Sequence, residues 1–263
     1  MTNFHEGSGP VRRVDITAIP GIPEIRQGED LAQTIWQSLE RVGLPLENGD
    51  ILVVAQKAVS KAEGLVIALY DVEPSPEAQR VARTVGKDPR LVEVILRESR
   101  EVLRTARDRL IVENRQGLIC ANAGVDRSNV SQARGPAVSL LPPDPDASAQ
   151  GIRQGIKRLS GKEVAVVISD SHGRPFRKGC VGVAIGAAGL ASLWDRRGQE
   201  DLFGRRLAST EVALADLVAS AALLAMGEAD EGTPVVLVRG APNPPGYGPA
   251  RDLIRSKQED LFR

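Results

Sequence analysis

The segment 164–186 limits the fold of this chain more than any other stretch of the sequence. It begins with an apolar, largely β-branched run at 164–169, which is typical of a buried strand. Gly173 and Pro175 then prevent continuation into a helix. A second apolar run, spaced by glycines, follows at 181–186. The pattern predicts a buried strand that ends in a polar segment.

That polar segment carries side chains suited to binding ions. Asp170 and Ser171 leave the predicted strand together, and their oxygens suit a hard divalent cation. Arg174, Arg177 and Lys178 follow, and such cations suit phosphate. The alternative is an ordinary charged hairpin turn, because loops are polar in any protein.

Composition excludes several classes of protein. The 263 residues allow one large domain or two small ones. Lys+Arg and Asp+Glu each number 34, so the net charge of +0 favours neither nucleic acid nor a membrane as a partner. Cys120 and Cys180 lie beside apolar residues without metal-ligand spacing, which predicts buried free thiols. We find no signal-peptide pattern and no membrane-spanning run, so we expect a cytoplasmic protein.

Apolar and amphipathic segments alternate along the chain. The apolar runs predict strands at 14–19, 51–55, 110–113, 117–120 and 234–238, and the amphipathic or alanine-rich segments predict helices at 31–42, 90–104, 147–159 and 209–226. The alternation predicts a mixed α/β (α+β) fold without a regular βαβ ladder. Neither a Rossmann glycine pattern after a strand nor a P-loop spacing is present. We expect a loose N-terminus at 1–13, one domain at 14–240 and a tail at 241–263.

Three other polar segments follow predicted elements. Lys57 and Lys61 come directly after the strand at 51–55 and could hold phosphate oxygens, with a solvated loop as the alternative. Asp126 follows an apolar strand as Asp170 does, and two such carboxylates could share a pair of cations. A single one is otherwise a helix cap or a turn residue. The acidic segment 228–232 is either a further source of metal ligands or a plain turn.

Taken together, these segments resemble one family, the coenzyme F420-0:γ-glutamyl ligases. The resemblance covers about residues 14–240. Several segments carry it in the same order: IPGI at 19–22, VSKAEG at 59–64, ANAGVDRSNV at 121–130, SDSHGRPFR at 169–177, AIGAAGL at 184–190 and MGEADEGTPVVLVRG at 226–240. Several ordered segments are far more specific than any single one.

The resemblance implies a fold and an activity. The fold would be an unusual two-part α/β fold that forms an intertwined homodimer. The activity would be the GTP-dependent addition of L-glutamate to coenzyme F420-0 through an acyl phosphate, with release of GDP and phosphate. Further γ-linked glutamates could follow. Each site would use two Mn²⁺ or Mg²⁺ ions, with activation by K⁺.

The resemblance also implies roles for individual residues. Asp126 and Asp170 would hold the first metal ion, and Ser171 and Glu228 would help to hold the second. Relatives often carry Gln at the position of Glu228, so the carboxylate adds one negative charge here. GTP would lie against Ile19, Pro20, Gly21, Ile22, Gln56, Lys57, Lys61, Asn129, Met226, Gly227, Glu228, Ala229, Asp230, Glu231, Gly232 and Thr233.

Catalysis would require cations around the transferred phosphoryl group as well as the metal ligands. Asp126, Asp170, Arg174 and Arg177 are therefore the expected catalytic residues. His172 is either a general base for the attacking amine or a hydrogen-bonding residue that orients the loop.

Two other functions use the same residue types. A metal-dependent phosphohydrolase would act on another phosphate ester with the same carboxylates, and it would need neither glutamate nor F420-0. A nucleotide-binding protein without catalytic activity would need fewer metal-type oxygens than the three polar segments provide.

Overall fold

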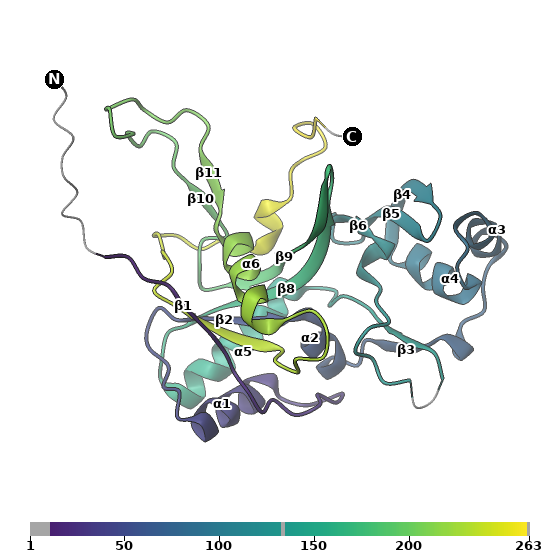
Figure 1. The fold of residues 1–263 in the computed structure, drawn as a ribbon, viewed down its shortest axis with the longest axis horizontal. Coiled ribbons are helices and arrows are strands. Elements are labelled where there is room, and N and C mark those ends of the chain that lie inside the picture. The colour runs from purple at the N-terminus through teal and green to yellow at the C-terminus, as the bar shows by residue number, and fades with distance from the viewer. Residues whose placement is uncertain (1–10, 133–134, 262–263) are drawn as a thin grey trace.

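The computed structural model describes residues 11–132 and 135–261. Of the terminus predicted at 1–13, residues 1–10 lie outside the described part, and 11–13 are exposed without regular secondary structure. A five-stranded sheet forms the centre of the molecule (Figure 1). Its order is β1 (Asp15–Ala18), β12 (Val235–Arg239), β2 (Ile51–Ala55), β8 (Ala165–Arg174) and β9 (Arg177–Ala188). In this sheet β2 and β8 run parallel, and the other neighbouring pairs are antiparallel.

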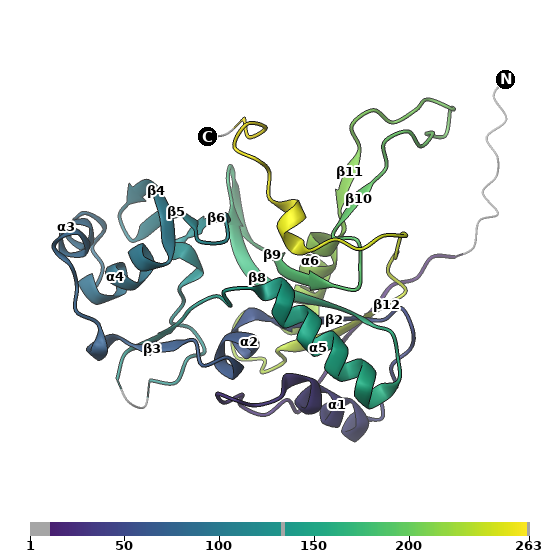
Figure 2. The same cartoon turned by 180° about the vertical axis from the view of Figure 1, so that it is seen from behind.

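Helices cover both faces of this sheet (Figures 1 and 2). The helices α1 (Leu31–Val42), α2 (Gln56–Ala62) and α5 (Pro145–Ser160) pack on one face, against side chains such as Leu52 and Val166. The helix α6 (Leu214–Met226) packs on the other face, against Val53 and Val167. Because strand side chains alternate between faces, continuous apolar runs in β2 and β8 supply both cores.

A second group of elements has a core of its own beside the sheet (Figure 2). It contains β3 (Val66–Ala68), α3 (Pro76–Val85), α4 (Pro89–Arg97), β4 (Ser99–Ala106), β5 (Arg109–Asn114), β6 (Ile119–Ala121) and β7 (Ala137–Ser139), with the short 3-10 helices η1 (Leu69–Asp71) and η2 (Asn122–Gly124). A third 3-10 helix, η3 (Ala250–Leu253), lies in the tail. The predicted mixed α/β fold is confirmed.

Two predicted helices differ from the structure. The helix predicted at 90–104 ends at Arg97, and the chain then forms β4, because the segment beginning at Ser99 pairs with β5 further along the chain. The helix predicted at 209–226 begins at Leu214. The residues before it, β11 (Glu211–Ala213), pair instead with β10 (Leu193–Asp195).

The strand predicted at 164–169 does not end at Ser169. It continues to Arg174, and Arg177 pairs opposite Arg174 across a tight turn at Pro175 and Phe176. Asp170 and Ser171 therefore lie within a long hairpin and not in a loop after the strand.

The two cysteines have different surroundings. Cys120 is buried as predicted, and burial, together with the charge of Asp170, raises the pKa of its thiol to about 12. The prediction of a buried Cys180 is wrong: this residue is exposed, because its part of the hairpin extends beyond the helices that cover the sheet.

Within the described ranges, every helix is too short or too polar to cross a lipid bilayer.

Candidate functional site

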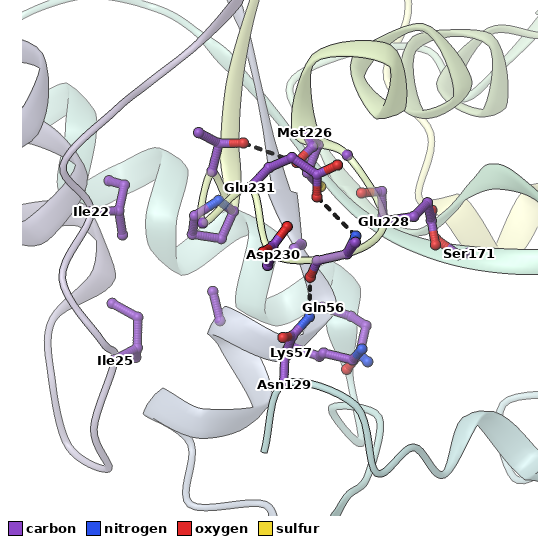
Figure 3. A pocket seen from close by; sticks show the side chains of 18 of the residues that line it. Ile22, Ile25, Gln56, Lys57, Asn129, Ser171, Met226, Glu228, Asp230 and Glu231 are labelled. Carbon is purple, nitrogen blue, oxygen red and sulfur yellow. Dashed lines mark hydrogen bonds between the residues drawn. The ribbon is translucent and has the colours of Figure 1, made fainter. Parts of the chain in front are cut away.

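An open pocket of about 480 Å³ lies where the end of β2 and the middle of β8 meet the loop that follows α6 (Figure 3). Ile22 and Ile25 line one side of it, and Gln56 and Lys57 lie at the start of α2, directly after β2. The pocket also contains, from the residues predicted for nucleotide or metal, Lys61, Asn129, Asp170, Ser171 and all of 226–233. The fold thus brings together segments from both ends of the chain.

The loop 226–233 is held by hydrogen bonds from its own side chains and from Asn129. Thr233 donates a hydrogen bond from Oγ1 to the backbone oxygen of Met226 at 2.9 Å. The carboxylate of Glu231 accepts one from the backbone N–H of Ala229 at 2.8 Å, and such backbone hydrogen bonds lower the pKa of Glu231. Asn129 donates from Nδ2 to the backbone oxygen of Ala229 at 3.1 Å, as Figure 3 shows. The shape of this wall is therefore fixed without a ligand.

Gln56 carries a polar atom whose hydrogen-bonding capacity is unused. The residue is 2% exposed, and its Oε1 accepts a hydrogen bond from Ser60 Oγ at 2.9 Å. Its Nε2 is buried and has no hydrogen-bond partner among the described residues. An unmet buried donor costs about 1–3 kcal/mol, so an acceptor on a ligand in this pocket would recover that cost.

Lys57 and Asp126 form an ion pair at the edge of the pocket, with 2.7 Å between Nζ and Oδ2. Ser128 donates to the same carboxylate from its backbone N–H at 2.9 Å and from its hydroxyl at 2.8 Å. Burial alone would raise the pKa of Asp126, but these hydrogen bonds and the charge of Lys57 outweigh it, and the net effect lowers the pKa. Asp126 is held ionised, although it is not among the residues that line the pocket.

The other predicted metal ligands lie on β8 and beside it. Ser171 donates a hydrogen bond from Oγ to Glu228 Oε1 at 2.5 Å, which joins the two residues predicted for the second metal ion. Asp170 Oδ2 lies 2.9 Å from His172 Nε2. The two residues share a face of β8, because side chains alternate along a strand. His172 therefore orients the carboxylate of Asp170.

These oxygens fit a divalent cation of a particular kind. Among the described residues, no three His, Cys, Asp or Glu side chains form a metal cluster. Mg²⁺ is commonly bound by one or two carboxylates, with phosphate oxygens and waters completing the shell. Asp170, Ser171 and Glu228 on one pocket wall fit such a cation, provided that a ligand supplies phosphate.

Several predicted site residues lie away from the pocket. Ile19 is fully buried in the core, and Gly21 forms a turn whose backbone oxygen accepts a hydrogen bond from Arg41 at 2.8 Å, so of the segment 19–22 only Ile22 lines the pocket. Arg174 and Arg177 close the far end of the hairpin. Arg174 lies four residues beyond Asp170 along β8, about 13 Å at the usual strand rise.

Some pocket residues were not predicted from the sequence. Ala55 and Ser169 face each other across the parallel pair of β2 and β8, at the end where the polar segments begin. Ligands often bind beyond the carboxyl ends of parallel strands, so the two adjacent strand ends could have indicated these residues. The contribution of Ile25 and Leu223 had no signal in the sequence, since both read as ordinary apolar core positions.

Comparisons with known proteins agree on one kind of relative. The family model described as F420-0:Gamma-glutamyl ligase matches residues 21–240. The chain is 49% identical to a protein of Methanocaldococcus jannaschii over 96% of this chain and 98% of the relative. It is 50% identical to one of Methanopyrus kandleri, over 98% and 100%. It is 41% identical to one of Haloarcula marismortui, over 95% and 96%. All three relatives carry the name coenzyme F420:L-glutamate ligase.

Proposed function

Because the chain belongs to the F420-0:γ-glutamyl ligase family, we propose that it joins L-glutamate to coenzyme F420-0 at the expense of GTP. The products are the glutamylated coenzyme, GDP and phosphate, and further γ-linked glutamates can be added to the first. The ligase and its substrates follow from the family. GTP as the nucleotide is what the resemblance to this family implies, and the lining of the pocket is compatible with it.

The proposal that a nucleotide binds here is supported by the residues that line the pocket. Lys57 provides a cation at the start of α2, and Gln56 provides a buried donor without a partner. The loop 226–233 lines the same pocket. A volume of about 480 Å³ is in the range of small-ligand pockets.

The proposed reaction has two steps. A carboxylate oxygen of F420-0 attacks the γ-phosphorus of GTP, the bond from that phosphorus to the β–γ bridging oxygen breaks, and GDP leaves. The amine of L-glutamate, after losing a proton, then attacks the acyl carbon, and phosphate leaves as the amide forms. Phosphoryl transfer of this type depends on positioning and charge neutralisation, so no protein nucleophile is required.

The residues of the chain supply the positioning. Lys57, which lines the pocket, would neutralise charge on the nucleotide. Asn129 holds the loop 226–233 in place through Ala229. Asp170, Ser171 and Glu228 would hold divalent cations, Mn²⁺ or Mg²⁺, which would neutralise phosphate charge. Asp126 would help to hold the first of these ions. K⁺ is a further proposed activator.

Arg174 and Arg177 are proposed to contact the anionic acceptor. Both lie beyond Asp170 along the hairpin, outside the pocket that surrounds the nucleotide. Replacing each by Ala is expected to raise the KM for F420-0 by about tenfold, which is the loss of one charge-assisted hydrogen bond, and to leave the KM for GTP unchanged. Steady-state kinetics with each substrate varied in turn measure both values. A rise confined to the KM for GTP would contradict the assignment.

An isotope experiment tests the acyl phosphate. F420-0 labelled with ¹⁸O in its reacting carboxylate is incubated with GTP, L-glutamate and Mn²⁺, and the phosphate released is analysed by mass spectrometry. Transfer of one ¹⁸O atom to phosphate for each amide formed is expected, because the acyl carbon–oxygen bond breaks in the second step. Glutamylated product with unlabelled phosphate would contradict this route.

A homodimer is also proposed. The segment that carries β10 and β11 extends away from the body of the molecule (Figures 1 and 2), and Leu202 and Phe203 on it are 95% and 76% exposed. Exposed apolar residues on an extended arm are typical of a protein contact. Light scattering should give the mass of two chains, and the mass of one chain would contradict the proposal. We place the protein in the cytoplasm, where its nucleotide and amino-acid substrates are available.

A further inference from the structure

The edge strand of the central sheet is bound by two polar side chains of α6. Among the described strands β9 is the last of this sheet, so its backbone groups that point away from β8 face no further strand there. Asp216 Oδ1 accepts a hydrogen bond from the backbone N–H of Ala184 at 2.8 Å. One helical turn later, Ser220 donates from Oγ to the backbone oxygen of Gly182 at 2.7 Å.

These two contacts lie directly behind the predicted metal ligands. Across the β8–β9 ladder, Gly182 pairs with Ser171 and Ala184 pairs with Ser169, so Asp170 lies opposite the residue between them. A register shift separates this part of the ladder from Ile168, which is a β-bulge. A bulge redirects side chains beside functional sites, so its surroundings must be held firmly.

Gly182 allows the helix to approach this closely. A Cβ atom on Gly182 would lie 2.5 Å from the backbone oxygen of Ala219, closer than real Cβ atoms come. The backbone of α6 is therefore in contact with β9 at this position. The helix cannot slide along the strand without breaking the bonds of both Asp216 and Ser220.

The same helix delivers Glu228 to the site. α6 ends at Met226, Glu228 follows two residues later, and its carboxylate accepts the hydrogen bond of Ser171. One rigid element thus contacts the hairpin behind Ser171 and also carries the residue in front of it.

We propose that Asp216 and Ser220 are positioning residues that set the distance of Glu228 from Asp170 and Ser171. This inference rests on the proposed function, because it assigns a purpose to the oxygens that hold the divalent cations. Neither residue is among those that line the pocket. Each acts by holding α6 against the hairpin.

The chain offers a matched control for this proposal. Asp146, on α5, accepts a hydrogen bond from the backbone N–H of Ala187 at 2.8 Å, the same kind of bond to the same strand on the other side of the bulge. It lies behind Val167, away from the pocket, and it also accepts from the N–H of Ala250 at 2.7 Å. Removing Asp146 costs at least as many hydrogen bonds as removing Asp216.

A conservative substitution of Asp216 separates the effect of its hydrogen bond from the effect of its charge. Burial raises the pKa of the Asp216 carboxyl. Asp216→Asn removes the charge, whose burial disfavours the folded state, and keeps an oxygen that can accept from Ala184. Asp216→Ala removes the acceptor itself. A positioning role therefore predicts loss in Asp216→Ala and recovery in Asp216→Asn.

The test compares Asp216→Ala, Asp216→Asn, Ser220→Ala and Asp146→Ala in the full-length protein. Three quantities are measured: kcat for glutamylation, the affinity for Mn²⁺ in the presence of GDP by titration calorimetry, and the melting temperature. Asp216→Ala is expected to lower kcat by about 10- to 100-fold, because misplacement by about 1 Å has effects of this size. Ser220→Ala, which loses one hydrogen bond, is expected to lower the Mn²⁺ affinity by about three- to tenfold.

Asp216→Asn is expected to recover both kcat and Mn²⁺ affinity, and Asp146→Ala is expected to lower the melting temperature alone. Equal losses in Asp146→Ala and Asp216→Ala would overturn the proposal, as would a wild-type Mn²⁺ affinity in Ser220→Ala. Should Asp216→Ala fail to fold, Ser220→Ala and Asp216→Asn decide the question. Wild-type protein that binds Mn²⁺ and GDP without forming product would contradict the proposed function, and the Mn²⁺ affinities would still decide the positioning role.

Discussion

Replacing Asp170 by Asn is expected to abolish glutamate ligation and to leave the fold intact. Asp170 lies on the pocket wall, and His172 holds its carboxylate in place. Asn keeps the size and one acceptor oxygen of Asp but removes the negative charge that a divalent cation requires. Loss of one group that stabilises the transferred phosphoryl typically lowers kcat by about 10²- to 10³-fold. Steady-state kinetics give the loss, and thermal unfolding followed by circular dichroism reports on the fold.

Asp195→Asn is the control for this change. Asp195 is an exposed carboxylate on β10 whose partner is Arg197, and it lies away from the pocket. The Asp195→Asn variant should keep the activity of the wild type. Near-normal activity of Asp170→Asn together with a native melting curve would contradict the metal assignment.

Replacing Lys57 by Met should lower kcat/KM for GTP by about 10²- to 10³-fold, because the pocket loses its cation at the start of α2. Arg in place of Lys should recover part of this loss, since it restores the charge and not the position of the ammonium group. Lys157→Met is the matched control, because Lys157 pairs with Glu163 on the surface. An unchanged kcat/KM for GTP in Lys57→Met would exclude the role of Lys57 in nucleotide binding.

The same substitution has a consequence for stability against acid. The pKa of Asp126 is lowered from its ordinary value of 3.8 in the folded protein, so its interactions stabilise the fold above that pH and are lost as the pH falls through the folded pKa. Lys57→Met weakens these interactions, so the loss of melting temperature on acidification below about pH 4 should be smaller than in the wild type. Melting curves over the acid range measure the difference. An identical acid dependence in both proteins would contradict the pairing of Lys57 with Asp126.

The sequence correctly predicted strands whose own residues determine their structure, whatever strand they pair with. The strands at 51–55 and 234–238 agree with β2 and β12 because an unbroken β-branched run between turns has few alternatives. The segment 99–104 has the apolar spacing of a helix. It forms a strand instead because it pairs with β5. Such a choice depends on residues further along the chain, so local periodicity cannot settle it.

The candidate site could likewise be predicted only in part from the sequence. The polar segments after β2 and within β8 were visible in the sequence, and the structure brings Lys57, Asp170 and Ser171 to one pocket. The contact between Ser171 and Glu228 spans 57 positions, and no spacing rule indicates it. The resemblance to the ligase family supplied that pair. The two arginines of the hairpin could not be placed, because the length of the hairpin follows from pairing with β9.

One incubation tests the central claim most directly. The purified protein is mixed with F420-0, GTP, L-glutamate and Mn²⁺, and the products are identified by mass spectrometry. A coenzyme that is heavier by one or more glutamyl units, with GDP formed in step, is the predicted result. GDP formed without any glutamylated coenzyme would contradict the account and indicate a phosphohydrolase, and the absence of both products would indicate a nucleotide-binding protein without ligase activity.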